Sequence, residues 1–538
     1  MRHGHRLFYP LSILSLAVLS AILLGHRLGS TGLWTDESIY AETAREMARS
    51  GDWITPELCG RPYLIKPPLY HWIASIAFHA LGPSETAPRL PQAAAGTAAV
   101  LLVGLLAGKL FDRRTAWLAG AALLTSPGFL IGSRVAGMDV LLTLCVTAAI
   151  LSFFRGYQRP AARRVWFLTA GYSCGMGMLA KGPLGLFIPA LVILLFLAAR
   201  RDLPLVWSRP ALEGSTLTLV VAAVWYAPVW IQHGRDFTRV YWLANNLARI
   251  TEPVSEHAGP FWFYLPVLVL AFLPWSLPFA VAFVRATFRI GRAGLRACGP
   301  EDLILILWFA APFLFYSAIA TKLPGYLLPT FPAAALLLAR EWERERAAPA
   351  EARRGGFRVA CALGAMALPG VALTVPFLLQ HRYGVRPGGI WLFPALAFAT
   401  ALVATLSALL SRGRLQSWMW VVAAAVFALG LVRFVVAPIE PFESMKGLTA
   451  KLLKKREAGF SVALAGAHLK GTLFYTGCSV PQPRDLRDLP RPGPDFPVYC
   501  LVKDRFRPDL EDWAKRGRFH LRTVRSSGAL SLVEASLE

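Results

Sequence analysis

The sequence predicts an all-α polytopic membrane protein with a small α/β domain at its C-terminus. Of its 538 residues, 55% are hydrophobic and only 16% are charged, against about 25% charged residues in soluble domains. Apolar runs recur from Leu7 to Pro438, and many reach the ~20 residues that cross a ~30 Å hydrocarbon core. Continuous runs such as PALVILLFLAA exclude a transmembrane barrel, whose strands alternate in polarity.

Hydropathy predicts about thirteen transmembrane helices within residues 1–438. The spans are expected near residues 8–28, 88–111, 115–132, 138–154, 165–180, 182–199, 214–232, 261–285, 303–319, 324–340, 358–379, 389–411 and 417–437.

The net charge of +24 is distributed as the positive-inside rule requires. With MRHGHR in the cytoplasm, the inner connections include KLFDRRT, RGYQRPAARR and SRGRLQ, whereas outer turns such as TKLPG hold one or two cations. This pattern predicts a cytoplasmic N-terminus and a C-terminus outside. It also argues against nucleic-acid binding, because the arginines are spread over many small loops rather than one face.

A cleaved signal peptide is the alternative for the first apolar run. The run has a basic start, but no A-x-A cleavage site follows it. We therefore expect a retained membrane anchor, and the topology of the remaining chain is the same in either case.

Residues 29–89 form a long outer segment with two expected interfacial helices. The first is SIYAETAREMARS, and the second is PPLYHWIASIAFHAL, opened by two prolines that tolerate a first helical turn. We interpret Glu42 and Glu46 as a solvated face, paired with Arg45 and Arg49 at helical spacing. A second long outer segment covers residues 233–260.

Residues 439–538 differ from the apolar region and predict a small α/β domain outside the membrane. The stretches FSVALAGA, FPVYCLVKD, FHLRTVRS and ALSLVEA are typical of strands, with helices near 445–457 and 508–516. This domain shows no catalytic constellation, and we expect it to serve acceptor recognition or stability.

Three of the seven cysteines, Cys59, Cys478 and Cys500, fall in expected outer segments. In bacteria that compartment is oxidising, so we consider a disulfide between Cys478 and Cys500. There is no C-x-x-C or zinc-type spacing.

Unusual charges gather at the outer ends of the expected spans. Charged residues are costly within a bilayer and are functional candidates there, although interfacial lysines and arginines also snorkel without any function. Together these residues offer cations for a phosphate and carboxylates for a proton or a sugar. They are Asp36, Glu37, Glu85, Arg89, Arg134, Asp139, Lys181, His257 and Lys322.

The stretch from WTDESIYAETAREM to KPPLYHW and PRLP resembles the opening of bacterial lipid-carrier-dependent glycosyltransferases. These are the 4-amino-4-deoxy-arabinose transferases of lipid A, close to the protein O-mannosyltransferases. Later matches are GMDVLLTL, LAKGPLG, HAGPFWFYLP and TKLPGYLLPTFP. The resemblance implies a GT-C fold in the inner membrane. It also implies a polyprenyl-phosphate sugar donor, with undecaprenyl phosphate as carrier, and an acceptor on the periplasmic side.

The resemblance also assigns roles to single residues. Asp36 matches the acidic residue taken as catalytic in the family, with Glu37 as its partner, and Asp139 matches a second required carboxylate. Tyr63, Lys66 and Tyr326 match positions beside the carrier phosphate. Arg134, Lys181 and Lys322 are added because they lie at the ends of expected spans. These six residues make up the expected phosphate- and lipid-binding set.

His257 matches a histidine that ligates a metal in some relatives, but the sequence departs from the family pattern nearby. Relatives commonly carry glutamate before the lysine of K-P-P-L, whereas this chain has Ile65. An isoleucine cannot ligate a metal, so another carboxylate such as Glu85 or Glu256 would be needed. We expect no required cofactor and do not predict a metal site.

Fixed cations would stabilise the charge that develops on a departing phosphate. A hydroxyl acceptor would also need a base, for which Asp36 is the candidate. The expected acceptor is lipid A, and protein O-mannosylation is the alternative. The non-enzyme alternative is a flippase or transporter of the lipid-linked sugar, but the repeats and midplane charges typical of transporters are not seen.

Overall fold

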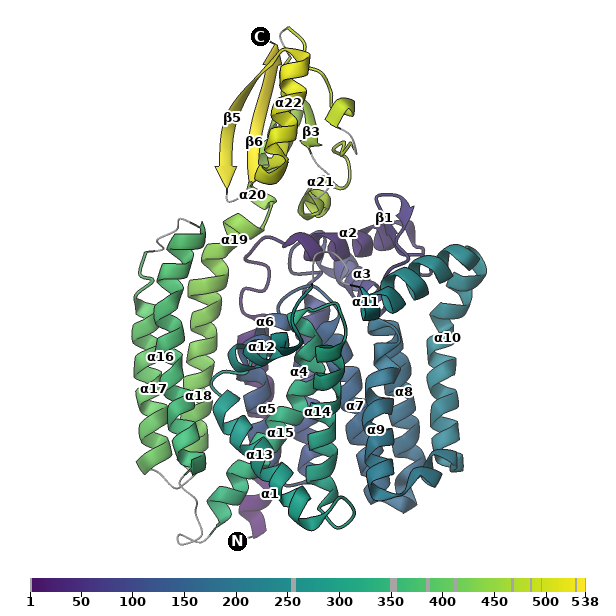
Figure 1. The fold of residues 1–538 in the computed structure, drawn as a ribbon, viewed down its shortest axis with the longest axis vertical. Coiled ribbons are helices and arrows are strands. Elements are labelled where there is room, and N and C mark those ends of the chain that lie inside the picture. Colours follow the sequence, from purple (N-terminus) through teal and green to yellow (C-terminus); the bar gives the residue numbers. More distant parts are fainter. Residues whose placement is uncertain are drawn as a thin grey trace.

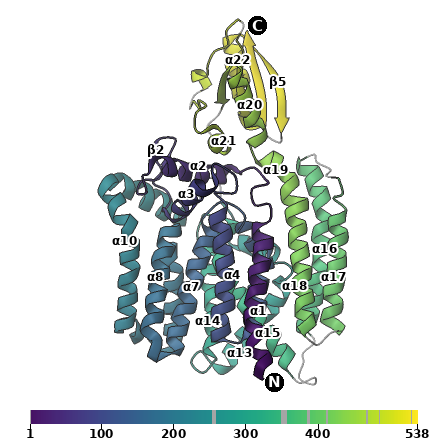
Figure 2. The same cartoon turned by 180° about the vertical axis from the view of Figure 1, so that it is seen from behind.

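The computed structural model describes residues 2–252, 258–348, 356–383, 388–410, 414–465, 469–483, 486–494, 496–527 and 530–537. Apolar helices stand side by side in one bundle, and a small α/β unit sits on one end of it (Figures 1 and 2). The N-terminus lies at the opposite end of the bundle. Helix α2 lies across the bundle, between it and the α/β unit.

The first part of the bundle follows the expected apolar runs closely. Its elements are α1 (Arg2–Ser20), η1 (Ala21–Gly25), α4 (Leu90–Leu110), α5 (Arg113–Thr125), α6 (Pro127–Gly132), α7 (Asp139–Gln158), α8 (Arg163–Lys181), α9 (Leu184–Arg200) and α10 (Arg209–Phe237).

The second part begins with two short helical segments that follow α10, and continues with further helices of the bundle. Its elements are η4 (Thr238–Leu247), α11 (Ala248–Thr251), α12 (Tyr264–Ala271), α13 (Ser276–Ala293), α14 (Pro300–Ala318), η6 (Pro324–Thr330), α15 (Phe331–Ala347), α16 (Gly356–Tyr383), α17 (Leu392–Leu410), α18 (Arg414–Leu431), η8 (Val432–Val436) and α19 (Ala437–Glu443).

Within the described residues, six helical segments are long and apolar enough to span a membrane, or seven if one bent pair counts as a single span. That bent pair corrects the straight span expected at 261–285. Phe261–Ala271 and Ser276–Ala293 meet at 119°. The span expected at 115–132 is also broken, because Pro127 disfavours helical backbone at the preceding residue, and Ser126 is extended.

Residues 29–89 contain the two expected helices, and a two-stranded hairpin, which was not predicted, joins them. Helix α2 (Thr35–Ser50) buries Ala41, Ala44 and Met47 along one side, as its amphipathic pattern indicates. Helix α3 (Leu69–Leu81) begins directly after Pro68. Strands β1 (Glu57–Leu58) and β2 (Arg61–Pro62) turn through Cys59 and Gly60.

The α/β unit has a four-stranded sheet in the order β3-β4-β6-β5. The bounds of the four strands are close to those expected from the sequence. The strands are β3 (Ser461–Ala465), β4 (Val498–Lys503), β5 (Phe519–Ser527) and β6 (Leu530–Leu537), and the helices are α20 (Lys446–Glu457), α21 (Leu473–Thr476) and α22 (Arg507–Gly517). Alternate β3 residues face opposite sides, as in any strand. Leu464 packs with Leu452 of α20, and Ala463 packs with Leu510 of α22.

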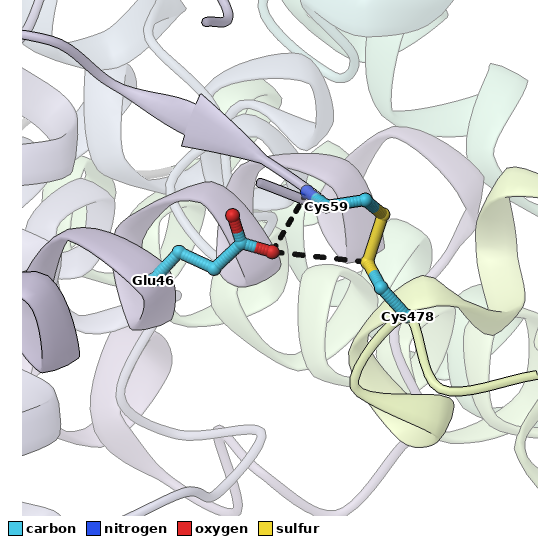
Figure 3. Close-up of side chains that lie close together, drawn as sticks. All are labelled: Glu46, Cys59 and Cys478. Carbon is cyan, nitrogen blue, oxygen red and sulfur yellow. Dashed lines mark hydrogen bonds between the residues drawn. A yellow bond between two sulfur atoms is a disulfide. The ribbon is translucent and has the colours of Figure 1, made fainter. Parts of the chain in front are cut away.

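The disulfide joins Cys59 to Cys478, so the pairing of Cys478 with Cys500 considered above is wrong. Cys500 is a buried free thiol in β4, within the core under α22. Figure 3 shows Glu46 of α2 beside the bridge, where its Oε1 accepts a hydrogen bond from the Cys59 backbone N–H at 2.7 Å. The bridge therefore ties the β1–β2 hairpin to the α/β unit across 419 residues of sequence.

Cys478→Ser should remove the cross-link and lower the thermal unfolding temperature in detergent, because the link constrains segments far apart in the sequence. Loss of a native disulfide typically costs about 2–5 kcal/mol in small domains. Mass spectrometry of an unreduced digest checks the pairing directly. Cys500→Ser is the matched control, and a cross-linked peptide containing Cys500 would contradict the assignment.

Candidate functional site

A buried ion pair between Glu37 and Arg89 supports the candidate site at the first turn of α2. Nε and Nη2 of Arg89 donate to the two carboxylate oxygens of Glu37, each at 2.8 Å. The other Arg89 donors bond to the carbonyls of Leu28, Thr31 and Gly32 and to the Thr31 hydroxyl. The charges of both partners are therefore neutralised and every guanidinium nitrogen is used.

Glu37 also holds two backbone segments in place. Its Oε2 accepts the Trp34 N–H at 3.0 Å, which caps the start of α2, and its Oε1 accepts the Ala136 N–H at 2.7 Å. The second bond fixes the turn that leads into Asp139, the first residue of α7. One carboxylate thereby sets the positions of both other predicted acidic residues, Asp36 and Asp139.

Asp36 itself is exposed at the first turn of α2, and two tyrosines lie near it. Burial is the main cause that raises the pKa of both Tyr40 and Tyr63, and the negative charge of Asp36 raises both further. The Asp139 carboxylate also raises the pKa of Tyr40. Asp36, Tyr63 and Asp139 therefore all lie within electrostatic range of Tyr40.

Three cations lie near these residues. Lys181, at the end of α8, pairs with Asp139, and its Nζ lies 4.8 Å from the centroid of the Tyr326 ring. Arg249 of α11 donates from Nη1 to the Tyr326 hydroxyl at 3.2 Å. Burial, and then the positive charges of Arg249 and Lys181, lower the pKa of Lys66 to about 7.

A short hydrogen-bond chain links the segments that carry these cations. Nδ2 of Asn245 donates to the Ile65 carbonyl at 2.7 Å, and Nη2 of Arg249 donates to the Asn245 amide oxygen at 3.2 Å. The Lys66 loop, η4 with α11, and η6 are thus joined through Arg249. Two carboxylates, Asp36 and Asp139, accompany three cations, so the site has a net positive charge and suits a phosphate.

Arg249 was missed by the sequence analysis. It lies in the second long outer segment, in NNLARI, where it has no recognisable motif around it. The same segment also holds Arg235 and Arg239, so its position in the sequence does not single out Arg249.

Two predicted phosphate-binding residues do not face the site. The Lys322 ammonium is buried and donates to the carbonyls of Tyr316, Ser317 and Ile319, at 2.5 to 3.0 Å. It satisfies the free carbonyls at the end of α14, a common use of lysine at helix C-termini. Arg134 likewise donates to carbonyls at the end of the first helix, and so lies apart from the Lys66 group.

The prediction that Glu42 and Glu46 form a solvated acidic face of α2 is also wrong in part. Glu42 is buried and paired with Arg45, so the charge pairing holds but the solvation does not. The Arg45 guanidinium lies 4.8 Å from the centroid of the Phe474 ring in the α/β unit. This face of α2 is covered because residues 470–478 pack against it.

His257 and Glu256 lie outside the described residues. Within the described part of the chain, one group of side chains has ligand atoms close enough for a metal, namely Glu46, Cys59 and Cys478. Its two sulfurs are bonded to each other, which excludes a thiolate site there. At the position where a glutamate was expected, Ile65 offers only a backbone carbonyl, and that carbonyl already accepts the Asn245 bond.

Comparisons with known proteins give the fold and the family. The crystal structure of ArnT from Cupriavidus metallidurans bound to undecaprenyl phosphate superposes with a TM-score of 0.73, at 21% identity, over 99% of this chain and 98% of that one. The chain therefore has the fold of this class of membrane protein. Residues 65–227 match the family model described as dolichyl-phosphate-mannose-protein mannosyltransferase.

The sequence relatives are more specific. An undecaprenyl phosphate-α-4-amino-4-deoxy-L-arabinose arabinosyl transferase from Edwardsiella ictaluri is 32% identical over 80% of this chain and 77% of its own length. One of the same name from Pectobacterium carotovorum is 33% identical over 77% of this chain and 74% of its own length. The protein belongs to the family of undecaprenyl phosphate-α-4-amino-4-deoxy-L-arabinose arabinosyl transferases.

Glu37→Gln should strongly destabilise the protein, because it leaves the Arg89 charge buried without its counter-ion. Breaking a buried pair in this way typically costs about 3–5 kcal/mol. Asp36→Asn is the matched control, since an exposed substitution usually changes stability by less than about 0.5 kcal/mol. Thermal unfolding of both variants in detergent gives the comparison, and equal unfolding temperatures would contradict a structural role for Glu37.

Proposed function

We propose that this protein transfers 4-amino-4-deoxy-L-arabinose from undecaprenyl phosphate to lipid A. Its family membership supports the donor and the sugar. The observation that carries the proposal is the group of Lys66, Lys181 and Arg249 beside the exposed Asp36. A phosphate and a sugar attached to it would meet cations and a carboxylate there together.

In the proposed reaction, the bond between the sugar's anomeric carbon and the carrier phosphate oxygen breaks. An oxygen of the acceptor forms the new bond to that carbon, and the carrier leaves as a phosphate monoester. Negative charge grows on the phosphate oxygens as the bond breaks. Lys66, Lys181 and Arg249 stabilise that charge, and Nε of Arg249, which is buried and donates to no described group, offers a further donor.

Asp36 is the residue we propose at the reacting centre. For a hydroxyl acceptor it would take the proton, whereas a lipid A phosphate is already anionic and needs no base. In that case Asp36 orients the acceptor or stabilises positive charge on the sugar. Glu37 and Asp139 act as positioning residues, because Glu37 is bound to Arg89 and Asp139 to Lys181. Tyr63 and Tyr326 line the donor pocket.

We also propose how the chain is placed in the inner membrane. Thirteen spans put the N-terminus in the cytoplasm, and the site with the α/β unit in the periplasm. The separation of the two ends of the bundle supports this arrangement, since Asp302 with Arg289, Arg340 and Arg344 forms an ionic network on the connections expected to be cytoplasmic. The α/β unit would then extend residues 439–538 into the periplasm.

The transfer is proposed to need no divalent metal. Ile65 stands where a ligating glutamate was expected, so the family's metal pattern does not fit the side chains here. No step of the proposed reaction runs through a metal, and unchanged activity in the presence of EDTA is the expected result.

Asp36→Asn should abolish the addition of a sugar-sized mass to lipid A in cells, while the lipid-linked sugar accumulates. Mass spectrometry of lipid A and of polyprenyl-phosphate sugars measures both pools, with Glu57→Gln in the same outer segment as the control. Unchanged lipid A in wild-type cells would redirect the proposal to a protein or glycan acceptor. Normal function of Asp36→Asn would instead favour a flippase.

Donor binding should weaken as pH rises above about 7. The Lys66 ammonium has a pKa lowered to about 7, so it is charged below that pH and becomes neutral above it, while a phosphate diester stays anionic throughout. Linkage sets a limit of about tenfold loss of affinity per pH unit. Binding of a polyprenyl-phosphate sugar between pH 6 and 8.5 measures this. Lys66→Arg should flatten the pH profile of binding, because arginine stays charged. A flat profile for the wild type would contradict the role of Lys66 titration in donor binding.

A further inference from the structure

A small cavity lies beside the Glu37–Arg89 pair, apart from the group of cations around Lys66. Its volume is about 60 Å³, so it holds one small anionic group rather than a whole lipid. Arg134 lines its polar side, and Ile131, Val432 and Val436 line its apolar side.

The cavity has a different lining from the donor side of α2. Trp34, the extended residue that precedes the helix, and Glu37 line it, whereas Asp36 and Tyr40 are not part of its lining. Residues 36 and 40 are one turn apart and share one face of the helix.

Arg134 gives this cavity a positive charge that no described carboxylate pairs with. Three of the five N–H groups of its guanidinium bond to the carbonyls of Leu23, Leu24 and His26. No described residue accepts a hydrogen bond from the other two N–H groups, and two is the number that a bidentate phosphate contact uses. The neighbouring Glu37 is neutralised by Arg89. Burial, and then the positive charge of Arg89, lower the pKa of Arg134.

The cavity also lies where apolar helices end. Arg134 bonds to carbonyls at the end of η1 and follows α6, while Val432 and Val436 belong to η8 after the apolar α18. At this level a lipid can place its phosphate in the cavity while its acyl chains follow the apolar helices inward.

We propose that this cavity is the subsite for a phosphate group of the acceptor lipid. The inference rests on the proposed function. Lys66, Lys181 and Arg249 already provide for the carrier phosphate near Asp36. Arg134 lies in a separate cavity with an apolar wall, which fits the phosphate of the second anionic lipid.

Arg134→Gln should raise the KM for lipid A about tenfold and leave the KM for the polyprenyl-phosphate sugar within about twofold. The purified full-length protein is assayed with lipid A carrying both phosphates and with its two monophosphorylated forms. The wild type should prefer the fully phosphorylated acceptor, and the variant should lose part of that preference. Arg433→Gln, on η8 but outside the cavity lining, removes the same charge and should change neither KM.

Val436→Glu tests the cavity without touching the bonds that Arg134 makes to backbone carbonyls. It places a carboxylate in the cavity wall and should raise the KM for lipid A as Arg134→Gln does, even where Arg134→Gln lowers the thermal unfolding temperature. An unchanged lipid A KM in Val436→Glu and Arg134→Gln would overturn the subsite.

Two further outcomes would also overturn it. An effect that follows the phospholipid content of the assay, whatever phosphates the acceptor carries, would assign the cavity to a membrane lipid. If the wild type transfers no sugar to lipid A, the proposed function fails and the subsite fails with it. Failure of the proposed function can be distinguished from failure of the subsite alone, because it would be seen with the wild-type protein.

Discussion

The buried ion pair between Glu37 and Arg89 is the interaction on which the rest of the site depends. It joins the loop after the first helix, the start of α2, the start of α4 and the turn before α7, through bonds to Gly32, Trp34 and Ala136. Taking two charges out of water is costly, and an isolated buried pair adds little stability. Here every guanidinium nitrogen and both carboxylate oxygens are hydrogen-bonded, which offsets that cost and leaves a single allowed arrangement.

As a consequence, Asp36 does not need a bonding partner of its own to hold it in position. Asp36 stays exposed at the first turn of α2, because the neighbouring Glu37 and the cap at Trp34 hold that turn. The cations opposite are less neutralised, since among the described residues Lys181 is the one of the three that forms an ion pair with a carboxylate. Burying Lys66 near the positive charges of Arg249 and Lys181 costs stability, as the lowered pKa of Lys66 indicates. A phosphate between them would remove that cost, so the same arrangement that disfavours the empty site favours the carrier.

Hydropathy and alternation predicted the helices and strands because these patterns are local. The four strands of the α/β unit and helices α2 and α3 lie close to their expected bounds for this reason. Clustering of charges at the ends of the expected spans also singled out Asp36, Asp139 and Lys181, all of which act electrostatically on Lys66 in the structure. Which cation faces a ligand could not be predicted in the same way. Lys322 and Arg134 both stand at helix ends, but tertiary contacts direct them to backbone carbonyls.

The same limit explains why Arg249 and the disulfide were missed. Arg249 becomes a site residue only when η6 places Tyr326 beside it, and Cys478 meets Cys59 only because α21 packs on α2. That packing is specific, since the Phe474 N–H donates to the Ser38 hydroxyl at 3.0 Å and the Tyr475 hydroxyl accepts the Leu33 N–H at 2.6 Å. The α/β unit therefore contributes to the site without lining it. It covers the side of α2 that faces away from the bundle, so the helix that carries Asp36 is held from both sides.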